Sequence, residues 1–308
     1  MKQDINYNKT LIVILGPTAI GKTALSIKLA RHFNTEIISS DSRQLFKEMK
    51  IGTAVPSTEE LNSVKHHFIG NLSISDYYNV SKFEKEALHK LDDIFLKNNL
   101  AIMVGGSGLY IDAVCKGIDD LPDPDKKLRH EINEIFKSSG IEALQKKLKE
   151  LDPEYYLIVD LKNPKRLMRA IEVCLQTGKT YTSLRKNKTG KRDFNIIKIG
   201  LNCEREKLFE RINLRVDKMI KKGLLDEVKE LYKHKNLNSL NTVGYKEIFD
   251  FLDNKTTFEQ AIENIKTNTR RYAKRQLTWF KRDEAIKWFH PTEKNKIILY
   301  LSEKMDYA

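Results

Sequence analysis

The sequence predicts an α/β protein in which helices flank a parallel sheet and a helical insertion interrupts the chain. Short apolar runs alternate with amphipathic helical patterns at the start of the chain, which is the order of a parallel sheet. A glycine-containing phosphate-binding pattern follows the first apolar run. After a break rich in proline and aspartate, charged amphipathic helices replace the strands.

Three apolar runs predict strands that are buried on both faces, at 11–15, 36–39 and 100–104. Parallel sheets covered by helices on both sides produce continuous runs of this kind. Residues 22–33 and 80–98, which lie between them, carry helical spacing. We therefore expect βαβ units and one sheet with helices on its faces.

The segment GPTAIGKT matches the pattern G-x-x-x-x-G-K-[ST] at every fixed position. A strand before this segment and a helix after it predict a P-loop in an NTPase-like sheet. The backbone N–H groups of such a loop hold phosphate at the N-terminus of the helix that follows. Lys22 would add positive charge, and the Thr23 hydroxyl is placed for Mg²⁺. The pattern does not decide whether the phosphate is transferred or released, and ATP would fit the same loop. The predicted diphosphate or nucleotide site consists of Gly16, Pro17, Thr18, Ala19, Ile20, Gly21, Lys22 and Thr23.

A helical insertion follows the break LPDPD at 121–125. The next strand is predicted at 195–201, helices at about 204–234 and 257–282, and a candidate last strand at 286–290. The predicted domains are a P-loop-type catalytic α/β core at 1–121 and 191–308, which ends in basic helices, and a helical insertion at 122–190.

Positive charge is concentrated in the later part of the chain. The net charge is +13; residues 1–120 hold 14 basic and 14 acidic side chains, whereas residues 121–308 hold 41 and 28. Such asymmetry is typical of proteins that bind a polyanion. A lysine-rich composition alone produces the same excess of positive charge. The charge distribution therefore has two interpretations, a nucleic-acid partner or a lysine-rich composition without such a partner.

A helix opened by Pro164 has a basic side and an apolar side. Its basic side carries Lys165, Arg166 and Arg169. The expected packing residues are Leu167, Ile171 and Val173.

Residues 264–282 carry seven basic side chains and no acidic one, with Tyr272, Trp279 and Phe280 between them. Positive charge interleaved with aromatic rings suits a phosphate backbone and unstacked bases. The alternative is a solvated helix, although such a helix normally mixes both signs of charge.

Two loops at predicted strand ends are further candidates, because open α/β sheets bind ligands at the carboxyl ends of their strands. Asp41 follows the second strand and would bind a metal ion, act as a general base or cap a turn; its position leaves all three roles open. Residues 104–111, VGGSGLYI, contain three glycines. These let the backbone approach a ligand or the P-loop, or form a tight strand-to-helix turn.

Several classes of protein are disfavoured. No stretch reaches the roughly 20 apolar residues of a membrane span, and residues 1–10 lack the apolar run of a signal peptide. The three cysteines stand far apart, which argues against structural zinc. His66 and His67 suit a strand edge better than a metal site. We expect a cytoplasmic protein without a membrane partner, and a monomer without an obligate protein partner.

Nine segments in this order resemble the tRNA dimethylallyltransferases of bacterial type, also called tRNA isopentenyltransferases. The resemblance extends from Leu11 to about Arg282. It rests on GPTAIGKT, SSDSRQLFKEMKIGTAVP, HHFIG, VGGSGLYI, LPDPD, NPKRLMRAIEV, RVDKMIKKGLLDEV, TVGYKE and TRRYAKRQLTWF.

The resemblance implies transfer of a dimethylallyl group from dimethylallyl diphosphate to the exocyclic amine of the adenosine 3′ of a tRNA anticodon. Pyrophosphate would be released and the i6A nucleoside formed. The implied catalytic residues are Asp41 as general base and Lys22, Thr23 and Arg215 at the diphosphate, with Mg²⁺ as the cofactor, held through Thr23.

The resemblance also implies contacts to the tRNA anticodon stem-loop, with the insertion gripping the stem and the amine reaching the diphosphate through a channel between the lobes. Two positions depart from the family pattern: Ser107 stands where threonine is frequent and keeps the hydroxyl, and Ile20 stands where a small residue is common. The implied tRNA-binding residues are Asp41, Ser42, Arg43, Gln44, Ser107, Lys165, Arg166, Leu167, Met168, Arg169, Gly244, Tyr245, Lys246, Arg271, Lys274, Arg275, Gln276 and Trp279.

Three other functions stay open at this point. A P-loop kinase of a small metabolite needs no polyanion surface, so the run at 264–282 counts against it. An isopentenyltransferase of free adenine nucleotides should lack a tRNA-gripping insertion, and the basic side chains at 165–169 count against that relative. A non-enzymatic RNA-binding protein would use the P-loop as a nucleotide switch.

Overall fold

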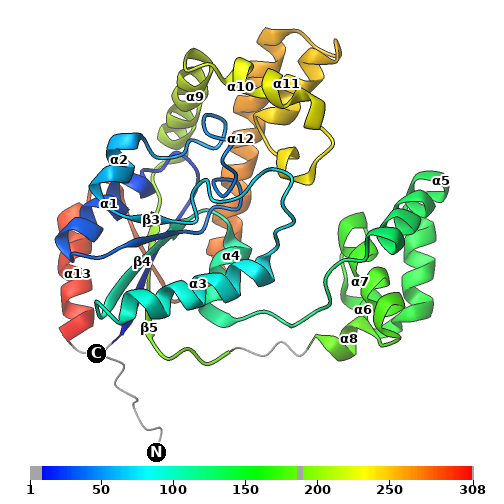
Figure 1. Ribbon diagram of the computed structural model, residues 1–308, viewed down its shortest axis with the longest axis horizontal. Helices are drawn as coiled ribbons and strands as arrows, with labels where there is room; N and C mark the ends of the chain where they lie inside the picture. Colours follow the sequence, from blue (N-terminus) through cyan, green and yellow to red (C-terminus); the bar gives the residue numbers. More distant parts are fainter. Residues whose placement is uncertain (1–8, 186–189, 307–308) are drawn as a thin grey trace, which may run out of the picture. The chain divides into compact units, whose positions relative to one another are not determined.

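In the residues that the structure describes, 9–185 and 190–306 of a computed structural model, six parallel strands form one sheet in the order β3-β2-β4-β1-β5-β6 (Figure 1). The chain leaves β1 on one side for β2 and resumes at β5 on the other side. The carboxyl end of β1 is therefore the switch point at which such sheets bind ligands. The strands are β1 Thr10–Leu15, β2 Ile37–Ser39, β3 His66–His67, β4 Leu100–Gly105, β5 Asn195–Leu201 and β6 Ile286–Phe289.

The described chain divides into two compact units. The larger unit consists of the described residues up to Cys115 and from Lys191 onward, and the smaller unit is Lys116–Gly190. The division thus falls before the domain boundary predicted at residue 121. The helices of the larger unit are α1 Lys22–His32, α2 Thr58–Ser63, α3 Val80–Phe95, α4 Gly108–Lys116, α9 Arg205–Lys221, α10 Leu224–Leu231, α11 Tyr245–Leu252, α12 Phe258–Phe280 and α13 Lys294–Asp306.

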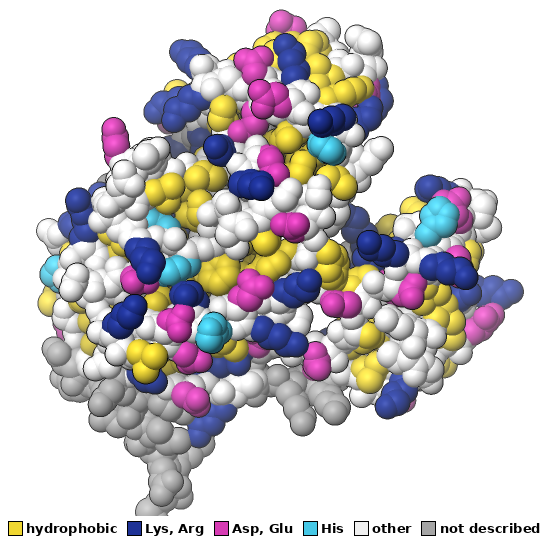
Figure 2. Space-filling model, viewed as in Figure 1, with side chains coloured by type: hydrophobic (Ala, Val, Ile, Leu, Met, Phe, Trp, Pro, Cys, Tyr) yellow, Lys and Arg dark blue, Asp and Glu magenta, His cyan; other side chains and the backbone are white. Residues whose placement is uncertain are grey.

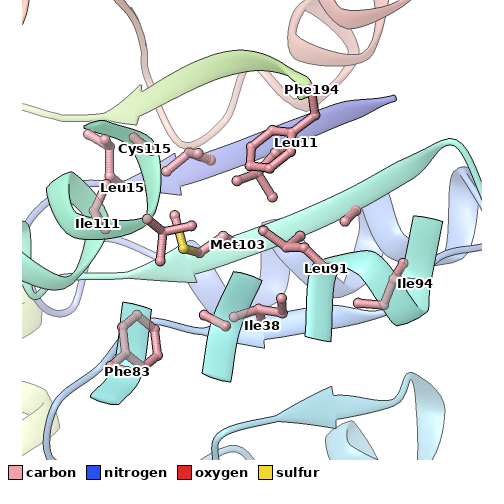
Figure 3. Packing of buried hydrophobic residues seen from close by; sticks show 14 of the residues in the cluster. Leu11, Leu15, Ile38, Phe83, Leu91, Ile94, Met103, Ile111, Cys115 and Phe194 are labelled. Atoms are coloured by element: carbon pink, nitrogen blue, oxygen red, sulfur yellow. The ribbon is translucent and has the colours of Figure 1, made fainter. Parts of the chain in front are cut away.

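Alternate residues of β1 pack on opposite faces of the sheet, because successive side chains of a strand point to opposite sides. Leu11, Val13 and Leu15 join the layer formed with α3 and α4, whereas Ile12 and Ile14 join the layer formed with α1, α9 and α13. Both layers are buried, which explains the unbroken apolar run of the strand. Figure 3 shows the first layer around Leu11 and Leu15.

A third cluster of the larger unit joins the end of α9 to α10, α11 and the start of α12. Val216, Val228 and Ile248 meet Phe46 and Met49 there. The segment after β2 is therefore packed on helices that come much later in the chain.

The smaller unit is helical and has its own core. Its helices are α5 Lys126–Leu151, α6 Pro153–Ile158, α7 Pro164–Thr177 and α8 Tyr181–Leu184. At Gly140 the backbone leaves helical geometry, with φ 72° and ψ −170°, so α5 consists of two helices joined at a kink. Leu167, Ile171 and Val173 are fully buried, which confirms the expected packing side of α7.

The expected helices after β5 were incomplete. The helix expected over 204–234 is broken at Gly223, whose φ of 94° is left-handed and caps the start of α10. Helices α11 and α13 were not predicted. The edge-strand interpretation of His66 and His67 is confirmed by β3.

No helix within residues 9–185 and 190–306 is long and apolar enough to cross a bilayer.

We expect Phe83→Ala to lower the free energy of unfolding by about 3–5 kcal/mol, because it removes a fully buried ring and leaves a cavity between α3 and the sheet. Figure 3 shows Phe83 beside the sheet in this layer. Chemical denaturation would measure the change. The matched control is Leu96→Ala just after the same helix, where the side chain is 85% exposed and the loss should stay below about 0.5 kcal/mol. Equal losses in the two variants would contradict this account.

Candidate active site

The P-loop connects β1 to α1 at the switch point of the sheet. Gly21 has a φ of 103° and precedes Lys22, the first residue of α1, so the loop N–H groups lie at the N-terminus of that helix. The Lys22 ammonium donates hydrogen bonds to the carbonyl oxygens of Gly16 at 3.0 Å and Pro17 at 2.7 Å. The lysine is thereby held against its own loop.

A cavity of about 430 Å³ opens beside the P-loop. All the residues that line it belong to the larger unit. It combines a polar part, suited to a diphosphate, with small and apolar side chains. The lining residues are Thr18, Ala19, Ile20, Gly21, Lys22, Thr23, Ser39, Asp41, Gln44, Ala54, Pro56, His66, Ile69, Val104, Gly105, Gly106, Arg211, Leu214, Arg215, Lys218, Tyr272 and Gln276.

Two positive charges and one carboxylate influence each other in this cavity. Burial and, to a smaller extent, the charge of Arg215 together lower the pKa of Lys22 to about 7, although Asp41 opposes the shift. Burial also lowers the pKa of Arg215, again opposed by Asp41. The site without ligand is therefore short of negative charge, which a diphosphate would supply.

Asp41 is fixed by the backbone that follows it. Its Oδ1 accepts hydrogen bonds from the amides of Arg43 at 2.9 Å and Gln44 at 3.4 Å, the turn-capping pattern of aspartate. The capping role is thus present, and it holds in the cavity a carboxylate that remains a candidate base. Ser107 supports the same turn, because its Oγ accepts from the Ser42 amide at 3.0 Å.

Gln276 of α12 joins the P-loop to the loop after β4. Its Oε1 accepts from the Thr18 amide at 2.8 Å and its Nε2 donates to the Gly106 carbonyl at 2.9 Å. A Cβ at Gly106 would lie 2.2 Å from this Nε2, and one at Gly108 would lie 2.3 Å from Trp279 Cδ1. Gly106 and Gly108 therefore permit a close approach to α12, whereas Gly105 lies against Ser40 after β2.

The donor groups of the cavity suit a hydrated Mg²⁺ ion. Thr23 provides a hydroxyl and Asp41 a carboxylate, and Mg²⁺ typically takes few protein ligands and completes its shell with water and substrate phosphates. Within the described residues no group of three or more His, Cys, Asp or Glu side chains forms a metal site. Thr23 and Asp41 therefore fit a metal ion that takes its remaining ligands from water or phosphate oxygens.

Comparison with known proteins decides the family. A family model described as IPP transferase matches residues 44–283. The chain is 57% identical over 297 residues to the tRNA dimethylallyltransferase of Christiangramia forsetii, covering 96% of this chain and 98% of that protein. The chain belongs to the IPP transferase family. The tRNA dimethylallyltransferase 1 of Bacteroides fragilis is 52% identical, with 95% and 97% coverage.

Solved structures of the family share the fold. The tRNA isopentenylpyrophosphate transferase of Bacillus halodurans has a TM-score of 0.72 at 37% identity, covering 97% of each chain. A eukaryotic dimethylallyltransferase described as acting on tRNA has a TM-score of 0.77 at 30% identity, covering 92% of this chain and 74% of that one.

Several tRNA-binding candidates of this IPP transferase have structural partners. Arg43 donates to the carbonyl oxygens of Asn238 at 3.1 Å and Ser239 at 3.0 Å. Leu167 and Tyr245 are fully buried, so the structure corrects their expected role: these two side chains pack inside the protein and offer no surface to a macromolecule. The buried Gly244 donates its amide to Glu247 and caps α11, while Lys246 is exposed.

The basic run of α12 is partly neutralised at one end. Lys266 pairs with Asp217 at 3.0 Å and Glu263 at 2.9 Å. Farther along, Arg271, Lys274 and Arg275 are exposed, and in the described part of the chain no carboxylate pairs with them. Figure 2 shows a face of the molecule on which both signs of charge are interspersed, as on an ordinary solvated surface. The middle of α12 differs from that pattern.

Among the described residues of the smaller unit, no carboxylate pairs with two of the cations of α7, whereas the third is engaged. Lys165 and Arg166 are exposed, and Met168 is half-buried. Arg169 donates to the buried Glu172 carboxylate at 2.8 Å and to the Pro122 carbonyl at 2.6 Å. Arg169 therefore fixes the segment that the sequence marked as a break.

The predicted site residues did not include Arg211, Lys218 and Tyr272, which line the cavity. Arg211 and Lys218 flank Arg215 on α9, and Arg211 donates to the Ala19 carbonyl of the P-loop at 2.8 Å. Tyr272 of α12 also lines the cavity, and burial raises its pKa, so its hydroxyl stays protonated. The spacing of 211, 215 and 218 on one side of a helix was the available signal for the first two.

We expect pyrophosphate binding to be coupled to proton uptake by Lys22. Because the pKa of Lys22 lies at about 7, the free protein loses this proton progressively as the pH rises above 7, and the bound anion restores it by favouring the ammonium. The affinity for pyrophosphate should therefore fall as the pH rises above 7, and the protonation of Lys22 contributes at most about tenfold per pH unit to this fall. Calorimetry in buffers of different ionisation enthalpy measures the uptake.

Pyrophosphate itself titrates, so Lys22→Arg serves as the control because its guanidinium stays charged. The wild-type protein should take up more protons than this variant above pH 7. Identical proton uptake in both proteins would contradict the role of Lys22.

Proposed function

We propose that this chain is a tRNA dimethylallyltransferase. It transfers the dimethylallyl group of dimethylallyl diphosphate to the exocyclic amine of the adenosine 3′ of the anticodon, forming i6A and releasing pyrophosphate. The observation that carries this proposal is one cavity that contains the P-loop, four cationic side chains and the fixed carboxylate of Asp41. A diphosphate cradle beside a candidate base suits transfer of the group attached to the diphosphate.

The diphosphate end of the substrate belongs at the P-loop. As the C–O bond lengthens, its electron pair moves to the diphosphate and the allylic carbon becomes positive. Lys22, Arg215 and the loop amides stabilise the negative charge that develops on the leaving group. Pyrophosphate departs intact, and no phosphoryl group is transferred.

The amine nitrogen forms the new C–N bond with its lone pair and then carries an excess proton. We assign Asp41 to accept this proton, since its carboxylate lies in the same cavity as the diphosphate cradle. The hydrogen bonds from Arg43 and Gln44 restrict Oδ1, so the carboxylate is oriented before the amine arrives.

We assign Mg²⁺ to the Thr23 hydroxyl and the diphosphate oxygens; when bound, it would neutralise charge on the leaving group. Arg271, Lys274, Arg275 and Trp279 of α12 and Lys165 and Arg166 of α7 are the proposed tRNA contacts, with the smaller unit holding the anticodon stem. We propose that the enzyme acts in the cytoplasm and as a monomer.

The three alternatives from the sequence are weaker. The relatives that match nearly the whole chain are called tRNA dimethylallyltransferases. Their names do not support a metabolite kinase, an isopentenyltransferase of free adenine nucleotides or a nucleotide-switched RNA-binding protein. The deciding experiment incubates the protein with Mg²⁺, an unmodified anticodon stem-loop and labelled dimethylallyl diphosphate, beside a reaction with ATP alone. Label on the adenosine 3′ of the anticodon supports the proposal. ATP consumption without label would favour a kinase.

We expect Asp41→Asn to lower kcat by about 10² to 10⁴. The asparagine keeps an Oδ1 that accepts from Arg43 and Gln44, so the turn should persist while the basic oxygen is lost. Single-turnover prenylation measures the rate, and tRNA affinity and Tm should stay close to wild type. A rate within a few-fold of wild type would exclude Asp41 as the base.

We expect the double variant Lys274→Gln, Arg275→Gln to weaken tRNA binding and flatten its salt dependence. Each lost phosphate contact should reduce the slope of log K against log salt by about 0.7–0.9. The control is Lys97→Gln, an exposed lysine at the amino edge of the sheet, just before β4. Filter binding at several salt concentrations measures the slope; an unchanged slope in the double variant would remove these residues from the interface.

A further inference from the structure

A second cavity, of about 900 Å³, adjoins the first. The two cavities share part of their lining: Thr23, Ala54, Pro56, Ile69, Arg215 and Lys218. Residues that line both must lie where the cavities meet. Ala54, Pro56 and Ile69 are the apolar members of this shared set, so they form the wall against which an apolar group beside the diphosphate would pack.

The chain that leads into this wall is held by a carboxylate from α10. Glu227 Oε2 accepts hydrogen bonds from the amides of Lys50 at 2.9 Å and Ile51 at 2.7 Å, and its Oε1 accepts from the Gly52 amide at 3.0 Å. Three successive N–H groups thus point at one charged side chain. Such charge-assisted bonds are about twice as strong as neutral ones.

Tyr245 of α11 completes the clamp on the 50–54 segment. Its hydroxyl donates to Glu227 Oε1 at 2.7 Å, and its ring is so close to Gly52 that a Cβ there would lie 2.5 Å from Tyr245 Cε2. Burial and the charge of Glu227 raise the pKa of Tyr245, which keeps the phenol protonated as a donor. Only glycine fits at position 52 against this ring.

The same segment also contacts the loop of the candidate base. Gln44 Nε2 donates to the carbonyl oxygens of Thr53 at 3.2 Å and Ala54 at 3.1 Å, and the Gln44 amide donates to Asp41. The wall is therefore held from α10 on one side and from the Asp41 turn on the other.

We infer that Glu227 is a positioning residue that fixes this wall and thereby restricts the enzyme to a short prenyl group. The inference rests on the proposed function. A dimethylallyl group beside the diphosphate would pack against Ala54, Pro56 and Ile69, which line both cavities. We expect a longer chain to need this wall to shift toward the second cavity, and the clamp on residues 50–52 opposes that shift.

The test compares kcat/KM for dimethylallyl diphosphate and geranyl diphosphate on one anticodon stem-loop. In Glu227→Gln, an amide NH₂ replaces one acceptor oxygen and faces backbone N–H groups, so the segment should loosen. We expect the preference for the dimethylallyl substrate to fall by about tenfold or more. Glu230→Gln, an exposed position on the same helix, should keep the wild-type preference.

The ratio of the two kcat/KM values distinguishes a positioning role of Glu227 from a general loss of activity. A merely structural role would lower both reactions together, so a folded Glu227→Gln with the wild-type ratio would overturn the inference. If that variant does not fold, Tyr245→Phe and Ala54→Gly decide by the same ratio. The positive φ of Ala54, 49°, suits glycine, and removing its methyl group opens the wall directly. A wild-type protein that transfers neither group would instead refute the proposed function.

Discussion

The repulsion between two buried cations, Lys22 and Arg215, is the constraint on which the rest of the site depends. Each charge is desolvated, and Arg215 further depresses the pKa of Lys22, with Asp41 as the carboxylate that opposes both shifts. Such an arrangement is costly without an anion, because a charge in a low-dielectric site is stable only when paired. The surrounding hydrogen bonds must therefore hold the cations in place until a diphosphate arrives.

Lys22 is held by the Gly16 and Pro17 carbonyl oxygens of its own loop, and the loops around the cavity are held by helices far along the chain. Gln276 of α12 holds the Thr18 amide and the Gly106 carbonyl, and Glu227 of α10 holds residues 50–52. The loops at the carboxyl edge of the sheet are thus fixed from outside the sheet. Since α12 also carries Lys274 and Arg275 on its surface, one rigid helix links the proposed tRNA surface to the P-loop.

Local patterns predicted the sheet and the P-loop, because buried parallel strands and phosphate loops are encoded by neighbouring residues. The structure of α11 could not be anticipated in this way: its short helix starts at Gly244 and is defined by packing on Val228 and Met49. The buried state of Tyr245 and the role of Glu227 depend on the same long-range packing. Sequence alone placed Tyr245 in a binding motif and attached no function to Glu227.

The site accelerates the reaction because it is more complementary to the departing diphosphate than to the dimethylallyl diphosphate ester. In the substrate, one diphosphate oxygen is bonded to carbon; as that bond breaks, its charge grows toward that of free pyrophosphate. Lys22, Arg215 and the P-loop amides lie on the cavity wall before this charge develops, so their attraction increases along the reaction coordinate. The same fixed charges would bind dimethylallyl diphosphate weakly relative to the transition state, which is the difference that lowers the barrier.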